Sequence, residues 1–187
     1  MAKPNPMERK LYLKENVDEK SVMPLIEAIH RINDDDAEKE KEYNGWEREP
    51  IQLYIYTYGG VCYAGFALID AIRASKTPVH TIVLGTAMSM GIFVFNAGHK
   101  RLIGEHATLM YHDVSISTGM NGEMTEGLKI ELDEALRLQK MGSDFLMEYS
   151  LVEESILKDY INRKADWYIS AEEAIRLKIA DAYYKLK

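Results

Sequence analysis

Twice in the middle of the chain, a run of apolar, β-branched and aromatic residues ends in small residues and passes directly into a helical pattern. Residues 51–56 form the first run, which is followed by Gly59-Gly60 and a helical stretch over residues 63–74. Residues 79–84 form the second run, and the small-residue turn at 85–91 comes after it. Such alternation is typical of a parallel sheet with crossover helices. The sequence therefore predicts an α/β fold whose two turns lie at the carboxyl edge of the sheet, where open α/β sheets place their sites.

Further elements follow from the spacing of apolar residues and from capping signals. Strands are expected at 11–13, 102–103, 108–111 and 182–184, and helices at 88–97, 125–149 and 153–163. The first helix is expected to start near Lys20 or Ser21, because Pro24 is tolerated only in the first turn of a helix. Ser170, with Glu173 three residues later, predicts the start of a short last helix.

The length of 187 residues predicts one domain that covers residues 1–187. Residues 1–8 are polar and contain two prolines, so we expect a loosely held N-terminus there. Residues 34–49 are dominated by charge without periodicity and predict a solvated loop or a frayed helix end. A long helix is expected over about residues 123–150.

The formal charge argues against two classes of partner. A net charge of −7 at pH 7 does not fit binding to nucleic acid or to an anionic membrane surface, both of which need clustered Lys and Arg. No stretch approaches the roughly 18 apolar residues of a membrane span, and the N-terminus has no signal-peptide pattern. Cys62 has no second cysteine to pair with, which fits a reducing compartment. We therefore expect no nucleic-acid or membrane partner and a cytoplasmic location.

Ser89 has the surroundings of a nucleophile. It lies in the turn at 85–91, where a strand ends and a helix begins, and this turn resembles the nucleophile elbow Gly-x-Ser-x-Gly except that Ala87 replaces the first glycine. The alternative role is an N-cap, which is a very common use of serine at a helix start. A serine nucleophile also needs a base. Of the five histidines, His112 closes a predicted strand, and a parallel strand ending there would bring its ring to the same sheet edge as Ser89.

Two features of the first turn are ambiguous. Gly59-Gly60 can bring backbone amides close to a ligand, but a plain strand-to-helix turn explains the same dipeptide. Cys62, which follows it, could act as a rival nucleophile, or it could be a packed and inert cysteine, which is the commoner role.

Four segments resemble the Clp protease proteolytic-subunit (ClpP) family and occur in the order that this family has. They are residues 53–60 with 64–70, the nucleophile motif at 85–91, Met110-Tyr111-His112, and residues 166–174. The resemblance covers roughly residues 9–185. It implies a ClpP/crotonase-like α/β fold, with a twisted sheet core of repeated ββα units and a long protruding handle helix. The helix expected at about 123–150 fits that handle.

The resemblance also assigns catalytic roles to three side chains. Ser89 would attack the peptide carbonyl, and His112 would take up its proton and pass it to the leaving amine. Asp166 would hold the imidazole in the useful tautomer. Neither a metal nor a cofactor is implied.

Backbone groups complete the implied site. The amides of Gly60 and Met90 would form the oxyanion hole. Gly59, Gly60 and Val61 would pair with the backbone of a peptide substrate as an added strand.

The family assembles as seven-membered rings, often stacked in pairs, and works with an AAA+ unfoldase. The resemblance therefore implies a homo-oligomer, either a heptameric ring or stacked rings, that encloses its serines and acts on peptides or unfolded proteins. Only eight residues precede Arg9, where the family has a loop that contacts the unfoldase, and residues 115–124 lack the glycine-rich strand that joins two rings. Asp113-Val114 replaces the usual Gln-Pro after the histidine and places a carboxylate beside the base. The sequence thus leaves the unfoldase and the double ring open.

Three functional interpretations follow. The first is a serine endopeptidase, with a virus-encoded relative that trims capsid or scaffold proteins as a close variant. The second is a ring subunit with a structural role only, although such paralogues typically lack triad members. The third is a crotonase-type acyl-CoA enzyme, which shares the core and the oxyanion hole but would use glutamates near the glycine turns. The presence of Ser89, His112 and Asp166 favours the peptidase.

Overall fold

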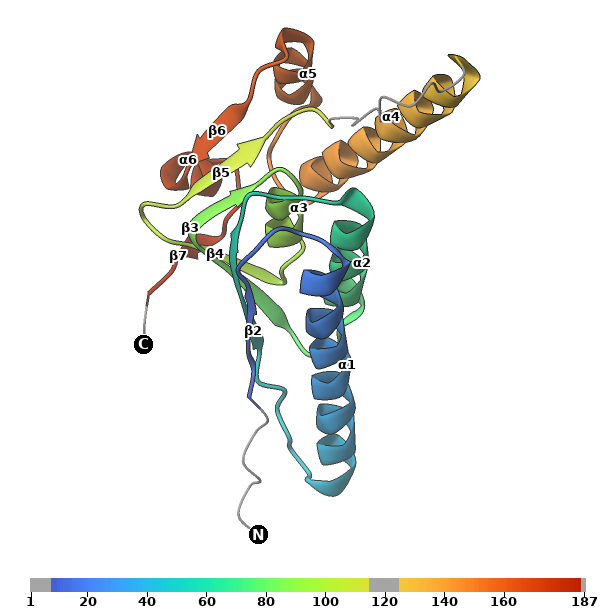
Figure 1. Cartoon of the computed structure of the whole chain (residues 1–187). Helices are drawn as coiled ribbons and strands as arrows, with labels where there is room; N and C mark the ends of the chain where they lie inside the picture. Colours follow the sequence, from blue (N-terminus) through green and yellow to red (C-terminus); the bar gives the residue numbers. More distant parts are fainter. Residues whose placement is uncertain (1–7, 115–124, 186–187) are drawn as a thin grey trace.

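The computed structural model describes residues 8–114 and 125–185 (Figure 1). Most of the expected loose N-terminus and the departure at residues 115–124 lie outside the described residues. In chain order, the elements are β1 (Lys10–Leu13), α1 (Glu19–Glu42), β2 (Ile51–Thr57), α2 (Cys62–Ala74), β3 (Val79–Met88), α3 (Met90–Asn96), β4 (Lys100–Ile103), β5 (Thr108–Tyr111), α4 (Thr125–Glu148), α5 (Glu154–Arg163), β6 (Trp167–Ser170), α6 (Ala171–Arg176) and β7 (Ala182–Tyr183).

The sheet is mixed and mostly parallel, as the alternation of strands and helices predicts. β1, β2, β3, β4 and β7 lie side by side in that order, and each neighbouring pair is parallel. β3 runs four residues further than the sequence pattern indicated, and it changes partner at Gly85, whose φ is 101°. Residues 80–83 of β3 pair with β4, whereas residues 86–88 pair with β5. β6 then adds to β5 in the antiparallel direction, so that the start of β6 lies beside the ends of β3 and β5.

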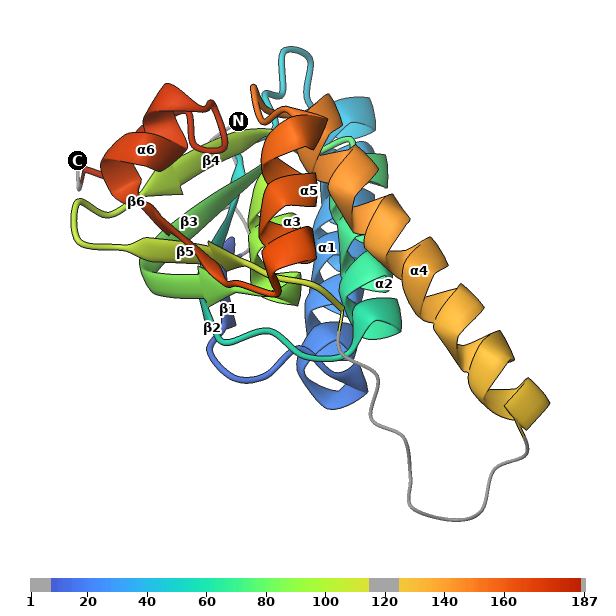
Figure 2. The same cartoon turned by 90° about the horizontal axis from the view of Figure 1, so that it is seen from above.

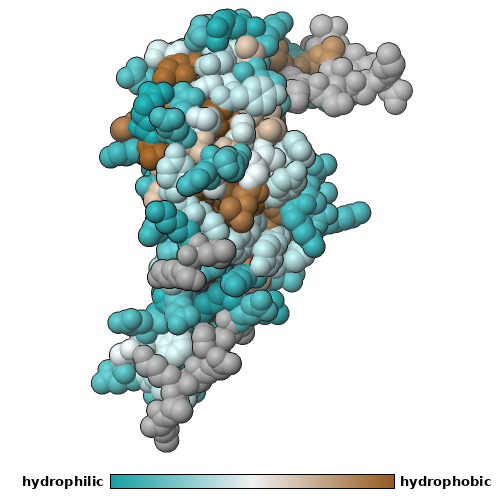
Figure 3. Space-filling model, turned by 90° about the vertical axis from the view of Figure 1, so that its left-hand side faces the viewer, coloured by the Kyte–Doolittle hydropathy of each residue, from teal (hydrophilic) through white to brown (hydrophobic). Residues whose placement is uncertain are grey.

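Helices α1, α2 and α3 cover one face of the sheet, and among the described residues the opposite face is exposed at β1 and β2 (Figure 1). In β2, Ile51, Leu53 and Ile55 are buried while the residues between them point to the opposite side, as the period of two requires. α1, α2 and α3 lie on the buried side, where their apolar residues join those of the strands in one core (Figures 1 and 2). The open side carries Tyr12 stacked on Tyr54. Figure 3 shows this side, with hydrophobic residues in its middle and at its upper left among more hydrophilic ones.

Of the two alternatives for residues 34–49, a loop is wrong for the first half, because α1 continues there as a regular helix to Glu42. The helix persists there because Asp36 faces inward, is fully buried, and binds the guanidinium of Arg9 at 2.6 and 2.9 Å. Thr77 and Trp46 donate two further hydrogen bonds to the same carboxylate. A polar segment is thus held in a helix by a partner that lies 27 positions earlier in the chain.

α1 also starts earlier than expected. Asp18 is its N-cap and forms a capping box with Ser21, so the first helical residue is Glu19. Pro24 therefore lies in the second turn rather than the first. Pro24 has no amide to donate to the carbonyl of Lys20. Lys20 is exposed, so water can bind this carbonyl instead.

The long helix expected at about 123–150 is α4, and it points away from the body of the molecule (Figures 1 and 2). Leu138 and Leu146, in its C-terminal half, are buried. Its N-terminal half carries apolar side chains that are exposed to solvent: Leu128, Ile130, Leu132 and Leu136.

Candidate active site

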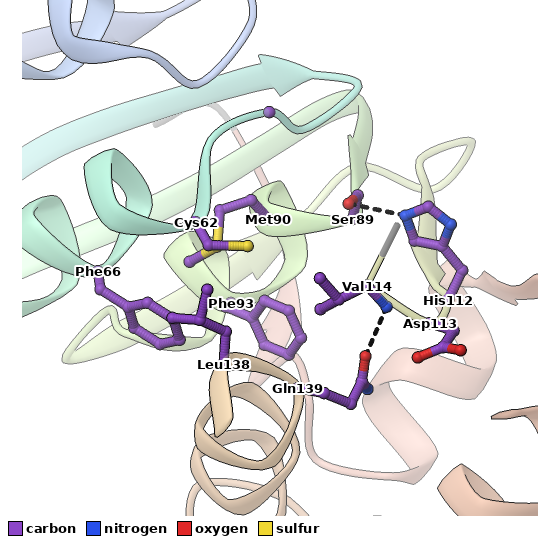
Figure 4. Close-up of a pocket in the computed structure, with 11 residues that line it drawn as sticks. Cys62, Phe66, Ser89, Met90, Phe93, His112, Asp113, Val114, Leu138 and Gln139 are labelled. Carbon is purple, nitrogen blue, oxygen red and sulfur yellow. Dashed lines mark hydrogen bonds between the residues drawn. The ribbon is translucent and has the colours of Figure 1, made fainter. Parts of the chain in front are cut away.

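Ser89 occupies a strained turn between β3 and α3. Its backbone has φ 51° and ψ −123°, a conformation that residues other than glycine rarely adopt and that costs of order 1–3 kcal/mol. Within the described residues, the hydroxyl caps no amide of α3. Instead, Ser89 Oγ lies 2.8 Å from His112 Nε2 (Figure 4). Ser89 thus occupies the N-cap position of α3, but its side chain does not act as the cap.

His112 reaches the serine because β5 ends beside β3. The parallel β3–β5 ladder pairs Met88 with Met110, and the Ser89 amide donates a 2.8 Å hydrogen bond to the Met110 carbonyl. His112 comes two residues after this contact, and its side chain is about one third exposed, at 31%. The backbone thus fixes the spacing of the two residues before their side chains meet.

Asp166 approaches the same histidine from β6. The antiparallel β5–β6 ladder pairs Tyr111 with Trp167. His112 and Asp166 are the next residues beyond this pair, so they lie opposite each other at the same end of the ladder. Asp166 Oδ1 lies 3.8 Å from His112 Nδ1, which is beyond hydrogen-bonding distance but close enough for charge interaction. Its other oxygen accepts a hydrogen bond of 3.3 Å from the Tyr168 hydroxyl. All three side chains expected to form a triad therefore lie at one edge of the sheet.

The glycine turn packs directly against the serine. Gly59 has φ 101°, and a Cβ at this position would lie 2.6 Å from the Cβ of Ser89. Gly60 has φ 150°, and its Cβ would lie 2.2 Å from the carbonyl oxygen of Val17. Both positions require glycine, so the dipeptide is more than an interchangeable turn.

Val17 already occupies one side of this turn. Its amide donates to the Gly59 carbonyl at 2.8 Å, and its carbonyl accepts from the Val61 amide at 2.7 Å. In an extended chain, the amide and carbonyl of one residue point to the side opposite those of its neighbours. The polar groups of Gly60 therefore point away from Val17, toward the side where a further strand can add. The Gly59 carbonyl and the Val61 amide are already bonded to Val17, so of the three residues expected to pair with substrate, Gly60 has the backbone groups best placed to do so. This pairing stays a prediction.

The two amides expected in the oxyanion hole lie near the serine. The bridge to Val17 does not use the Gly60 amide. Met90 is the first residue of α3, where an amide has no carbonyl partner within the helix. Gly60 and Met90 line the same pocket as Ser89 and His112, and their role as an oxyanion hole stays a prediction.

A comparison with known families bears directly on this arrangement. The family model described as Clp protease matches residues 6–185. The chain belongs to the Clp protease family. An ATP-dependent Clp protease proteolytic subunit of Deinococcus radiodurans is 35% identical over 136 residues, which cover 71% of this chain and 64% of the relative, slightly less than two thirds. Proteolytic subunit 3 of a Synechococcus strain is 32% identical over 178 residues (94% of this chain, 82% of the relative). Proteolytic subunit 2 of a Prochlorococcus marinus strain is 32% identical over 170 residues (90% and 78%).

The family and the matched relatives are named as proteases, and a pocket with polar and apolar walls lies beside Ser89 (Figure 4). Its apolar lining comes from α2, α3 and α4: Cys62, Phe66, Met90, Phe93 and Leu138. Burial raises the pKa of the Cys62 thiol, which therefore stays protonated at neutral pH. This protonation favours a packed cysteine over the rival nucleophile.

Gln139 is a residue of this Clp protease site that the sequence reasoning missed. It lies on the buried face of α4, where its Oε1 accepts from the Val114 amide and its Nε2 donates to the Tyr111 hydroxyl, each at 2.6 Å. A polar side chain within the apolar stripe of a long helix, directly after Leu138, was the signal that could have found it.

Over residues 8–114 and 125–185, no helix is both long and apolar enough to cross a membrane. The same residues contain no group of three or more His, Cys, Asp or Glu side chains arranged to hold a metal ion.

Proposed function

We propose that this member of the Clp protease family is a serine endopeptidase that cleaves peptides and unfolded proteins. The observation that carries the proposal is the 2.8 Å contact between Ser89 Oγ and His112 Nε2 at a strained turn. A serine hydroxyl is a weak nucleophile unless an adjacent base removes its proton. The 3.8 Å separation of His112 and Asp166 is compatible with this role, because catalytic hydrogen bonds are often long until substrate binds.

The proposed reaction follows from these positions. Ser89 Oγ attacks the scissile carbonyl as His112 Nε2 takes up its proton, and the amides of Gly60 and Met90 stabilise the oxyanion. The imidazolium then gives its proton to the leaving amine, which breaks the peptide bond and leaves an acyl-serine. Water, activated by the same imidazole, releases the acid and restores Ser89. Asp166 stabilises the imidazolium in both halves.

The apolar side chains that line the pocket beside Ser89 support a preference for one kind of substrate residue. A peptide that pairs with Gly60 lies along the edge of this pocket. We therefore expect cleavage after an apolar side chain, which the pocket removes from water.

We further propose that the chain works in the cytoplasm as a homo-oligomer, either a heptameric ring or stacked rings. The exposed apolar residues at the free end of α4 support an assembly, since a patch of this kind favours burial against another surface. The matched relatives are named ATP-dependent proteolytic subunits. An AAA+ unfoldase as partner of this chain is compatible with those names, but the serine chemistry does not require one.

A fluorophosphonate probe, which reacts with activated serines, tests the central proposal. The native protein is expected to label, and the Ser89→Ala and His112→Ala variants are expected not to label. Ser155→Ala and His106→Ala are matched controls, because both residues are exposed and lie outside the pocket. Cleavage of fluorogenic peptides with an apolar residue before the scissile bond should follow the same pattern.

The alternatives give different results. A folded native protein that neither labels nor cleaves would overturn the peptidase and favour a subunit with a structural role only. Acyl-CoA that copurifies with the protein would instead favour a crotonase-type enzyme.

A further inference from the structure

The strand that leads to His112 is held by two neighbouring strands. β5 is paired with β3 up to Met110 and with β6 up to Tyr111. After β5, residues 112–114 belong to no strand or helix. The orientation of the imidazole therefore depends on what holds the backbone just beyond the strand.

Gln139 of α4 makes contacts on both sides of the histidine. Its Oε1 accepts a 2.6 Å hydrogen bond from the Val114 amide, two residues after His112 (Figure 4). Its Nε2 donates a 2.6 Å hydrogen bond to the hydroxyl of Tyr111, the residue before His112. One carboxamide thus fastens the positions that precede and follow the histidine.

The surroundings make this contact rigid. Gln139 is 8% exposed and Tyr111 is fully buried, so that water cannot readily replace either hydrogen bond. The Tyr111 ring packs edge-on against Phe93, and its hydroxyl lies 2.9 Å from Ser143 Oγ, one turn further along α4. A side chain at this position has to accept a hydrogen bond from the Val114 amide. Toward the Tyr111 hydroxyl it can either donate a hydrogen bond, as Gln139 does, or accept one.

We propose that Gln139 is a positioning residue, which holds His112 in place to accept the proton of Ser89. The inference rests on the proposed serine chemistry, but the contact itself is independent of that chemistry. Misplacement of a catalytic group by about 1 Å can cost on the order of 10²-fold in rate. Loss of the carboxamide should therefore slow the reaction of Ser89 about 10- to 100-fold while the protein stays folded.

The decisive comparison is between methionine substitutions at two adjacent positions of α4. Gln139→Met keeps the length of the side chain but removes both hydrogen-bonding groups. Lys140→Met is the matched control, because Lys140 is strongly exposed and bonds only to Asp144 on its own helix in the described structure. Gln139→Glu is the conservative variant, since its carboxylate can accept from both the Val114 amide and the Tyr111 hydroxyl.

Three readouts separate positioning from other roles. Gln139→Met should lower the rate of fluorophosphonate labelling and kcat about 10- to 100-fold, with KM changed less than about threefold. The pH dependence of labelling should shift, because a misplaced imidazole no longer acts as the base. Hydrogen exchange of a peptic fragment that contains Val114 should speed up. Gln139→Glu should recover most of the rate, and Lys140→Met should match the native protein in all three.

The outcomes distinguish this inference from the proposed function. Labelling of Gln139→Met at the native rate, or a loss that appears in KM alone, would overturn the positioning role and leave the serine peptidase standing. A native protein that does not label, together with faster exchange in Gln139→Met, would overturn the peptidase and support the hold of Gln139 on the segment. Unchanged exchange at Val114 would overturn that hold.

Discussion

Two clusters of polar side chains in this molecule are built in opposite ways. Near the end of α1, the carboxylate of Asp36 is fully buried and accepts four hydrogen bonds, two from Arg9 and one each from Thr77 and Trp46. Ser89 and His112, which follow β3 and β5, and Asp166, which precedes β6, are at least partly exposed. Ser89 and His112 share a hydrogen bond of 2.8 Å, and a carboxylate oxygen of Asp166 lies 3.8 Å from His112 Nδ1.

The difference shows how one fold separates stability from reactivity. The Asp36 carboxylate accepts four hydrogen bonds, while Arg9 Nε is buried without a partner in the described residues, and the burial of the cluster makes each missing partner expensive. The Ser89 cluster sits on a strained backbone and keeps unused hydrogen-bonding capacity that a substrate can take up. We therefore expect changes in the Asp36 cluster to lower the free energy of unfolding, and changes in the Ser89 cluster to lower the activity.

The largest expected effect is the loss of peptidase activity when Ser89 is replaced. Ser89→Gly and Ser89→Ala should both lower peptidase activity by at least about 10³-fold, because the nucleophile is gone. Glycine relieves the positive φ whereas alanine does not, so Ser89→Gly should be more stable than Ser89→Ala by about 1 kcal/mol in chemical denaturation. Glycine normally destabilises relative to alanine, and that ordinary order at position 89 would contradict the strain.

The opposite profile is expected for Asp36→Ala. Removing the carboxylate leaves the Arg9 guanidinium buried without its counter-ion, which should lower the free energy of unfolding by about 3–5 kcal/mol. Below the unfolding transition, the labelling rate per folded molecule should equal the native rate. Asp34→Ala, on the exposed side of the same helix, is the control and should change stability by less than about 0.5 kcal/mol. A similar small loss for Asp36→Ala would remove the contrast between the clusters.

The smallest effect concerns acid stability. Burial alone would raise the pKa of Asp36, but the hydrogen bonds from Arg9, Thr77 and Trp46 outweigh it and lower the pKa to about 2. Because the folded pKa lies below the unfolded value of 3.8, the contribution of this group is complete above about pH 4 and is lost as the pH falls toward 2. That contribution is about 2 kcal/mol. The difference in unfolding free energy between the native protein and Asp36→Asn should shrink over this window, and a constant difference would contradict the lowered pKa.

The parts of the fold that could be predicted from sequence are those that local pattern determines. The buried strand over Ile51–Thr57, the helix after the glycines and the cap of Ser170 on the amide of Glu173 all follow from period, turn chemistry and capping. Asp166 was placed by its motif, while β6, which positions it, is only four residues long and takes its form from β5.

What could not be predicted depends on partners that are distant in sequence. The helical state of the segment around Asp36 requires Arg9, and nothing local to residues 34–42 indicates that contact. The length of β3 depends on its exchange of β4 for β5 at Gly85. In the site, the role of Gln139 requires α4 to pack beside Val114, a contact across 25 positions that no local period encodes.

Gly45 and Gly59 both have positive φ, at 80° and 101°, yet they set different limits on how this gene can vary. A Cβ at Gly45 would meet nothing within 4 Å, so a drifting population can sample asparagine or aspartate there at the modest cost of a left-handed backbone. A Cβ at Gly59 would meet that of Ser89 at 2.6 Å. Every replacement at position 59 displaces Ser89. We therefore expect glycine to be retained at position 59 in relatives that use this serine, whereas position 45 can change without effect on the site.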